Sequence, residues 1–404
     1  MSQTDKPNGR LAAALAITAL VLLCINPGLT QGEDNKNLLL CSAMCLSPLV
    51  MLMRGARVFM PRIDIPLVTV CICVIGMPCI FHPASVRWIT MLFTCAYCVY
   101  FMMLARLVRM PHFTEHDVTR IIAGIIYAFA AVLVLQQFCV LFGLPVPFEA
   151  MSYQGLPWKL NSLTAEPSHT AVTLGALMFF YTLTRRTADP HESLWLCFRR
   201  QWPVWICFVW VMFSTVNASA YLLAPLCLIP YIDRHTWPYA LLAAAAVALI
   251  VFLTPVGQFS QIKRLKDTMV ATLTLNPEKI IEADGSAAFR IVPTIYGAKA
   301  IHPTESDFWT GHGTDADQRD IEERPYDRDH KGSAGIFSLL YNYGAICALA
   351  FWAAIFTTCV NTRKWITIIP ALFALQLSVD FNMQLCWMVM AFALLYNTVS
   401  TSRR

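Results

Sequence analysis

Twelve long apolar runs follow one another along the chain, and polar segments separate most of them. The apolar residues are continuous within each run, which indicates helices rather than the alternating strands of a membrane barrel. A helix needs about 20 mostly apolar residues to cross a bilayer, and hydrocarbon tolerates only helices or closed barrels. The pattern therefore predicts an all-α, polytopic membrane protein of about 12 transmembrane helices, over residues 11–30, 37–53, 65–81, 88–107, 121–144, 171–184, 203–216, 218–232, 237–254, 335–360, 365–380 and 385–399.

Lysine and arginine are unevenly distributed between alternate loops, and these residues are retained on the cytoplasmic side of a membrane. With the N-terminus inside, the short loops of the outer face contain only Lys36, Arg87 and Lys159. The topology therefore predicts both termini in the cytoplasm. The run over 11–30 has no small-residue cleavage signature, so we expect a retained helix rather than a signal peptide. The inner segments contain Arg54, Arg57, Arg62, Arg106, Arg109, Arg120, Arg185, Arg186, Arg199, Arg200, Arg234, Arg363 and Lys364.

Composition agrees with this class of protein. The chain is 57% hydrophobic and 14% charged, which excludes a soluble enzyme and a disordered chain. Its net charge of +5 does not gather on one soluble face, so we expect no nucleic-acid partner. Nearly all of the 15 cysteines lie inside apolar runs, without the spacing of a zinc site. We expect these cysteines to be structural, and we expect no metal.

Long polar segments divide the chain into five parts: N-terminal transmembrane helices (1–144), a first outer loop (145–168), middle transmembrane helices (169–254), a large outer loop (255–332) and C-terminal transmembrane helices (333–404). A loop as long as the second is usually functional or disordered, and its aromatic residues favour function. Residues 269–275 and 287–300 predict amphipathic helices that lie on the membrane. The large loop is therefore expected to be partly helical.

Glu166 stands directly before a proline, in Thr164-Ala165-Glu166-Pro167-Ser168, at the outer boundary of a predicted helix. Partial loss of solvent at a membrane interface can raise the pKa of a carboxyl toward that of a general base, so Glu166 is a candidate base. The same pattern is typical of an ordinary helix start, with proline in the first turn and the carboxylate favourable to the helix dipole. Both interpretations stay open on the local sequence.

Arg290 and Lys299 lie in one predicted amphipathic segment of the large loop. A guanidinium that faces an external cavity is suited to bidentate binding of phosphate oxygens. The alternative is an arginine whose apolar stem lies along the membrane interface while its charge stays in water. The sequence does not separate these two interpretations.

Gly311-His312-Gly313 follows Phe308-Trp309 in the same loop. Paired glycines allow backbone N–H groups to approach a ligand, and histidine titrates near neutral pH. The motif lacks the spacing and the strand context of a nucleotide site. His330, just before the next predicted helix, is a further candidate base or hydrogen-bond donor, or a histidine at a membrane boundary.

Charged residues are almost absent from the predicted helices, where Asp64 and Asp380 stand only at the ends. A proton- or ion-coupled transporter normally has ionisable groups near the middle of the membrane, and a channel normally has a charged ring or a filter. The pattern therefore disfavours transport and conduction.

The order of these features resembles the O-antigen polymerase and O-antigen ligase superfamily of bacterial inner membranes. The elements that resemble it, from residue 145 to residue 344, are Glu166-Pro167-Ser168, Ser214-Thr215, Ser219-Ala220-Tyr221, Arg290, Gly311-His312-Gly313 and Tyr343-Gly344. Ligases commonly have a His-Asn pair where this chain has Ser333-Ala334, and a Ser-Arg pair where it has Ser219-Ala220. These departures favour the polymerase, whose family is more divergent.

The resemblance implies a GT-C-like fold and a glycosyltransferase that uses no metal or other cofactor. Its donor and acceptor would be undecaprenyl-diphosphate-linked glycans, joined at the periplasmic face of the inner membrane. Arg290 would bind the diphosphate with help from Lys299, and Gly311 and Gly313 would offer backbone contacts. Glu166, then His312, then His330 are the candidate bases. A chain-length regulator and a flippase would be its protein partners.

Two alternatives stay open. A ligase would transfer the glycan to lipid A-core. A non-enzymatic flippase or transporter would need polar residues along a transmembrane path, which the sequence lacks.

Overall fold

The computed structural model describes residues 6–27, 37–53, 58–148, 157–215, 220, 223–233, 236–242, 260–320, 334–378 and 384–401. Over these ranges the chain is helical and contains no β-strand. The elements are α1 (Lys6–Cys24), α2 (Leu38–Met51), α3 (Pro61–Phe81), η2 (Pro83–Ser85), α4 (Trp88–Arg109), α5 (Glu115–Leu141), α6 (Pro167–Ala188), α7 (Leu194–Arg200), α8 (Trp202–Ser214), η3 (Ala224–Tyr231), α11 (Ser260–Leu273), α12 (Pro277–Ala283), α13 (Gly285–Ala300), α14 (Asp307–Thr310), α15 (Ala316–Asp320), η5 (Gly335–Phe337), α16 (Ser338–Cys359), η6 (Trp365–Thr367), α17 (Ile368–Leu377) and α18 (Gln384–Thr401).

Four of these helices are long and apolar enough to cross a membrane, which is the character of a membrane protein. They are Pro61–Phe81, Trp88–Arg109, Glu115–Leu141 and Gly335–Cys359. Four shorter apolar helices, Gly9–Cys24, Leu38–Met51, Trp202–Ser214 and Trp365–Leu377, coincide with further predicted spans. The all-helical class is confirmed, while the number of 12 spans and the topology stay predictions.

One predicted span differs from what the structure describes, and another lies mostly outside the described residues. The run over 218–232 contains the 3₁₀-helix η3, which includes two prolines and is eight residues long. Such a helix rises about 2 Å per residue, so its length of roughly 16 Å is too short to cross a bilayer. Only residues 237–242 of the span over 237–254 lie within the described residues, and they are helical.

Local signals in the sequence account for several helix boundaries. Thr114 and Asp117 form a reciprocal capping box at the start of α5. Pro167 is the first residue of α6, where its missing N–H is not required. The predicted amphipathic segment 287–300 falls in α13, and residues 269–273 of the segment 269–275 fall in α11, so helical structure is confirmed over these residues.

The chain forms two compact units. The first contains Met1–Leu46, Leu104–Thr254 and Ala391–Arg404, and the second contains Ser47–Met103 and Pro255–Met390. The five segments that hydropathy predicts stay a prediction. The N-terminal part, 1–144, contributes to both units, and the large loop belongs to the second.

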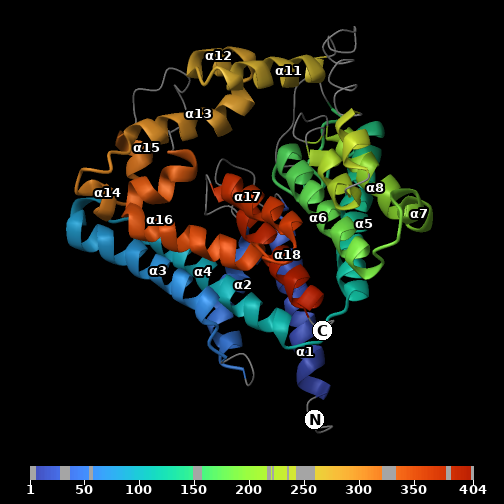
Figure 1. The fold of residues 1–404 in the computed structure, drawn as a ribbon, viewed down its shortest axis with the longest axis horizontal. Coiled ribbons are helices and arrows are strands. Elements are labelled where there is room, and N and C mark those ends of the chain that lie inside the picture. The colour runs from blue at the N-terminus through green and yellow to red at the C-terminus, as the bar shows by residue number, and fades with distance from the viewer. Residues whose placement is uncertain are drawn as a thin grey trace. The chain divides into compact units, whose positions relative to one another are not determined.

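In the first unit, α6 packs against α5, α8 and η3 (Figure 1). Every residue of α6 from Thr173 to Thr184 is buried. Gly175 allows close packing here, because a Cβ at this position would lie 2.8 Å from the Cβ of Leu223. The first unit is therefore built around α6.

In the second unit, α3 packs along α16 (Figure 1). Trp387 of α18 is fully buried and stacks on Tyr97 of α4, with ring centroids 5.6 Å apart. The helices α11, α12 and α13 follow one another and enclose a small apolar core of Ala271, Ile280, Ala288 and Val292. The large loop is thus a helical layer with its own core.

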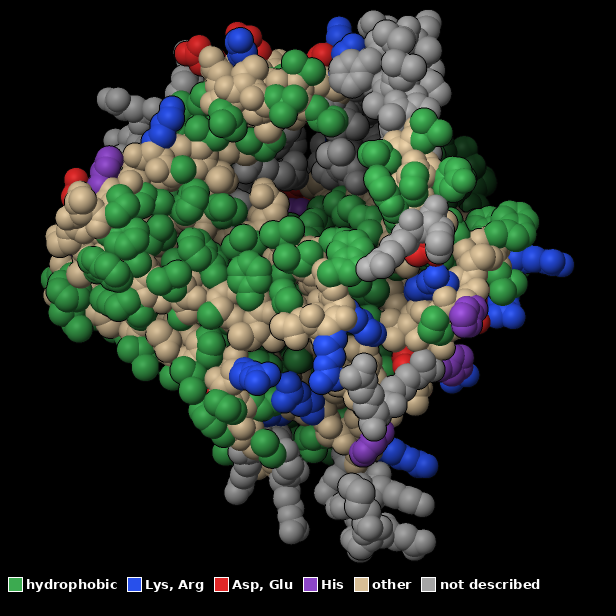
Figure 2. Space-filling view, in the orientation of Figure 1, with side chains coloured by type: hydrophobic (Ala, Val, Ile, Leu, Met, Phe, Trp, Pro, Cys, Tyr) green, Lys and Arg blue, Asp and Glu red, His purple; other side chains and the backbone are tan. Residues whose placement is uncertain are grey.

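Large apolar side chains are exposed along the long helices, and Figure 2 shows them as a broad surface over α3 and α16. On α3 they include Ile65, Ile72 and Ile80, which are 55%, 66% and 71% exposed. An exposed surface of this kind is unfavourable in water and suits contact with lipid chains. The exposure pattern therefore agrees with a chain that is embedded in a membrane.

Candidate functional site

The helix α16 is broken near its start, at Gly344. The backbone of this residue has φ 82° and ψ 172°, far from helical values. A carbonyl of a regular helix accepts a hydrogen bond from the N–H four residues later, so the break frees carbonyl groups in the preceding turn. The carbonyls of Tyr341 and Asn342 accept instead from the N–H groups of His312 and Gly313, at 2.9 and 3.0 Å. The Gly-His-Gly segment therefore lies along the broken turn of α16.

Glycine is required on both sides of this contact. A Cβ on Gly311, which has φ 74°, would overlap the carbonyl oxygen of Asn342. A Cβ on Gly344 would overlap the carbonyl oxygen of Trp309. The paired glycines were predicted to allow backbone groups to approach a ligand. In the structure Gly311 allows two backbones to approach each other, while a Cβ on Gly313 would overlap the Ser85 hydroxyl oxygen. A contact of Gly311 or Gly313 with a ligand stays a prediction.

The imidazole of His312 has a defined orientation. Its ring stacks on Tyr341, with centroids 4.1 Å apart and an interplanar angle of 8°. Nδ1 lies 3.0 Å from the Tyr341 carbonyl oxygen, which only accepts hydrogen bonds, so Nδ1 carries the proton. Nε2 of the neutral ring therefore has the free electron pair, and it lies 3.8 Å from Oδ2 of Asp307. This arrangement allows Nε2 to accept a proton and places a carboxylate where it stabilises the resulting imidazolium.

A small pocket opens beside His312. Its polar lining includes His302, Glu305 and Asp307, and its apolar lining includes Phe308 and Leu340. Carboxylates accept hydrogen bonds from hydroxyl groups, and an aromatic side chain offers a flat apolar surface. The pocket therefore places two carboxylates, a second imidazole and an aromatic ring next to the imidazole of His312.

A buried carboxylate fixes the segment that follows Gly313. Asp317 is 2% exposed, and its Oδ2 accepts from the Ala334 N–H at 3.0 Å and from the Ser338 hydroxyl at 2.7 Å. Its Oδ1 accepts from the Asn342 side-chain amide at 2.9 Å, and the Asp317 N–H donates to Asn342 Oδ1 at 2.9 Å. Asp317 thereby connects α15 to the part of α16 that precedes the break.

Replacing Asp317 with asparagine is expected to lower stability by about 2 to 4 kcal/mol, because three buried donors then meet an amide in place of a carboxylate. Thermal unfolding of the purified protein in detergent measures this change. Asp315→Asn is the matched control, since the ion pair of Asp315 with Arg87 is partly exposed and is expected to contribute about 1 kcal/mol or less. Equal losses in the two variants would contradict the role of Asp317.

The turn between α3 and α4 holds the other side of the Gly-His-Gly segment. Nε2 of His82 lies 2.7 Å from the Gly311 carbonyl oxygen. Arg87 and Thr90 both donate to Oδ2 of Asp315, each at 3.2 Å. The sequence prediction included neither His82 nor Asp315, and it treated Arg87 only as a loop charge. No local signal connects residues that are more than 220 positions apart.

The helix α13 carries the two predicted diphosphate ligands. It packs against η5, where a Cβ on Gly297 would overlap the Ala334 carbonyl oxygen. This contact brings α13 to the end of α16 at which Asp317 is bound. Lys299 is exposed, with its ammonium 5.9 Å from the centroid of the Tyr296 ring. Arg290 lies in the helix, and its side chain is outside the described part of the structure.

Glu166 belongs to the first unit and directly precedes α6. Its carboxylate accepts a hydrogen bond from the Ser168 hydroxyl at 2.9 Å, and its carbonyl accepts from the Thr170 N–H at 3.1 Å. The interpretation of this motif as a helix start is confirmed. The role of Glu166 as a base stays a prediction, and His330, the third candidate base, lies outside the described residues.

The structure therefore brings Gly311, His312 and Gly313 together with the end of α13, and it adds Asp307, Asp317 and Asn342, which sequence reasoning missed. Asn342 directly precedes the motif Tyr343-Gly344, and this adjacency is the signal in the sequence that could have indicated Asn342. Comparison of the chain with protein-family models and with curated proteins finds no match.

Proposed function

We propose that this protein is a membrane glycosyltransferase that polymerises lipid-linked oligosaccharide repeat units. The order of motifs in the sequence supports the class, and the orientation of His312 in the broken turn of α16 is the observation that carries the chemistry. The membrane-embedded character of the chain suits a donor and an acceptor that are both attached to a polyprenyl lipid. The proposed location is the inner membrane of a bacterium, with the site at the periplasmic face.

In the proposed reaction, a hydroxyl of the acceptor sugar attacks the anomeric carbon of the donor glycan. The bond between that carbon and the diphosphate oxygen breaks, and a new glycosidic bond forms. Nε2 of His312 takes the hydroxyl proton, and Asp307 stabilises the imidazolium. The departing diphosphate needs positive charge, which we assign to Arg290 with Lys299 as its helper.

His312 is the base that the geometry favours, since a carbonyl hydrogen bond directs its electron pair away from the backbone. Glu166, which ranked first in the sequence, is the alternative base. The Glu166→Gln variant should therefore keep most of its activity. If this variant forms no polymer while His312→Gln stays active, the general base is Glu166.

Replacing Arg290 with alanine is expected to abolish long glycans, because the leaving diphosphate then lacks its bidentate partner. The experiment is the ladder of surface glycans from a strain that lacks the gene, complemented with the wild type or with the variant. Membrane insertion of each protein is checked on the same samples. Arg319→Ala, on the short helix α15, is the control for loss of an arginine from the same unit.

The same ladder tests the whole proposal. Single-repeat glycans in the deletion strain support the polymerase. Long polymer that stays on the lipid carrier and never reaches lipid A-core would identify a ligase instead. An unchanged ladder would contradict both enzymatic proposals and would favour a transporter instead.

A further inference from the structure

The short helix α7 carries an exposed aromatic surface. Trp195, Phe198 and the following Trp202 are 70%, 39% and 55% exposed, and the rings of Trp195 and Phe198 stack with centroids 5.9 Å apart. Cys197 faces the opposite way and is fully buried. The helix is therefore held in the first unit by one face and presents aromatic rings on the other.

The exposed surface continues on α8, the apolar helix that follows. Ile206, Val209, Trp210 and Phe213 are between 42% and 63% exposed. Their spacing of three or four residues places them along one face of that helix. The exposed apolar surface of α8 is thus continuous with that of α7, and it includes Trp195 on α7 and Trp202 at the start of α8. Tryptophan is enriched where a membrane protein meets the headgroups, because its ring is apolar and its N–H is polar.

Two arginines lie within this aromatic surface. Arg199 and Arg200 end α7, and both are exposed. Among the described residues, Arg199 has no ion pair, and Arg200 lies 3.6 Å from Glu192 while its side chain stays 54% exposed. In Figure 2, positively charged and hydrophobic side chains lie next to each other in the region of α7.

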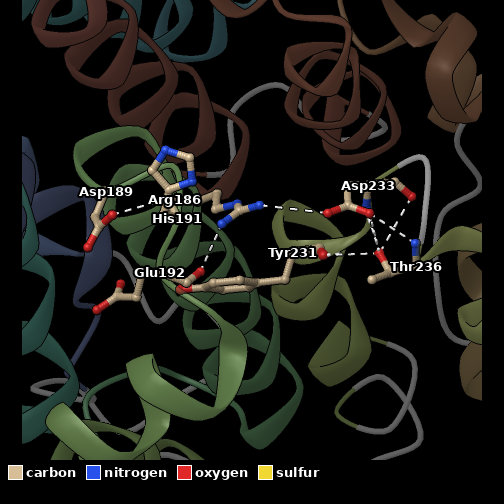
Figure 3. Close-up of polar contacts among 7 residues, drawn as sticks. All are labelled: Arg186, Asp189, His191, Glu192, Tyr231, Asp233 and Thr236. Atoms are coloured by element: carbon tan, nitrogen blue, oxygen red, sulfur yellow. Dashed lines mark hydrogen bonds and ion pairs between the residues drawn. The ribbon is translucent and has the colours of Figure 1, made fainter.

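The neighbouring arginines, Arg185 and Arg186, have carboxylate partners within the first unit. Glu192 is fully buried, and Arg185 donates to both of its carboxylate oxygens. Burial lowers the pKa of the Arg185 guanidinium, but the hydrogen bond and the charge of Glu192 raise it more, so its net shift is upward. Arg186 donates to the Glu192 carbonyl at 2.9 Å and pairs with Asp233 at 3.9 Å (Figure 3).

These contacts hold the start of α7 in place. Arg185 and Arg186 join the end of α6 to the turn that precedes α7, and Ser193 caps α7 by accepting from the Leu196 N–H at 3.2 Å. Glu192 is shared by Arg185 and Arg200, and Asp233 pairs with Arg186, so the four arginines keep a net positive charge, which is exposed at Arg199 and Arg200. It stands among aromatic rings of the kind found at the bilayer surface.

We propose that α7 lies in the headgroup layer of the bilayer and binds anionic phospholipid through Arg199 and Arg200. The aromatic rings enter the boundary of the acyl chains, and the two guanidinium groups bind the phosphate oxygens. Charge complementarity selects this partner, because a zwitterionic lipid leaves the two positive charges without a net counter-charge. The inference is independent of the proposed glycosyltransferase activity.

The test uses the full-length protein in nanodiscs of phosphatidylcholine with increasing phosphatidylglycerol, and it measures the thermal midpoint at each composition. The wild-type midpoint is expected to rise with the anionic fraction. An arginine near an anionic surface contributes roughly a five-fold gain in affinity, so R199Q/R200Q is expected to bind phosphatidylglycerol about 30-fold more weakly. R199K/R200K keeps the charge and is expected to retain most of the rise.

R109Q/R120Q is the matched control, since it removes two exposed arginines from elsewhere in the same unit. An apparent affinity of R199Q/R200Q equal to that of the wild type would overturn the proposal. A wild-type midpoint that responds equally to both lipids would overturn it as well. Loss of the response in the R109Q/R120Q control alone would move the lipid site to the α4–α5 turn.

Discussion

Replacing His312 with glutamine is expected to reduce the rate of polymer formation by roughly 10² to 10⁴-fold, the usual contribution of a positioned base. Glutamine keeps a polar side chain of similar length but has no group that accepts a proton near neutral pH. The contacts of the Gly-His-Gly backbone with Tyr341 and Asn342 do not involve the imidazole and should persist. The measurement is the initial rate of chain extension by the purified protein with lipid-linked single repeats.

His116→Gln is the control, because His116 is exposed on the first turn of α5 in the other unit. It is expected to keep the wild-type rate. Binding of the lipid-linked donor should be unchanged in His312→Gln, since the proposed role concerns only the proton. A wild-type rate in His312→Gln would remove this residue as the base.

The substitution Gly344→Ala is expected to lower polymer formation by at least about 100-fold, because it removes the surface on which His312 is positioned. Alanine at φ 82° and ψ 172° is strained by roughly 1 to 3 kcal/mol, and its Cβ overlaps the Trp309 carbonyl. A regular helix relieves both problems. The carbonyls of Tyr341 and Asn342 would then accept from the N–H groups of α16 itself and release His312 and Gly313.

Hydrogen exchange gives a readout that does not depend on activity. The amides of His312 and Gly313 are hydrogen-bonded in the wild type and should exchange faster in Gly344→Ala. Gly76→Ala is the matched control, since Gly76 lies within α3 and a Cβ there meets nothing within 4 Å. That variant is expected to be neutral or slightly stabilising. Full activity and unchanged protection in Gly344→Ala would contradict the proposed role of the break.

The two glycine-containing motifs of the site show how far the sequence leads toward it. Gly311-His312-Gly313 and Tyr343-Gly344 both stood out as motifs, but nothing in their spacing indicates that they touch. A single glycine in a long apolar run costs a helix only about 1 kcal/mol, so the run over 335–360 predicts an unbroken helix. Asp317 was one of many charged residues in the large loop, and only its burial distinguishes it.

The sequence by itself determined the all-helical class, the membrane character and most helix boundaries within a few residues. Hydropathy, capping residues and prolines act over one or two helical turns, so they can be read without knowing the rest of the fold. The tertiary structure alone decided that α16 breaks at Gly344, that η3 is a 3₁₀-helix, and that Asp317 and Asn342 join the large loop to α16. Each of these features depends on which distant segment supplies a hydrogen bond or occupies a space, and neither hydropathy nor helix propensity contains that information.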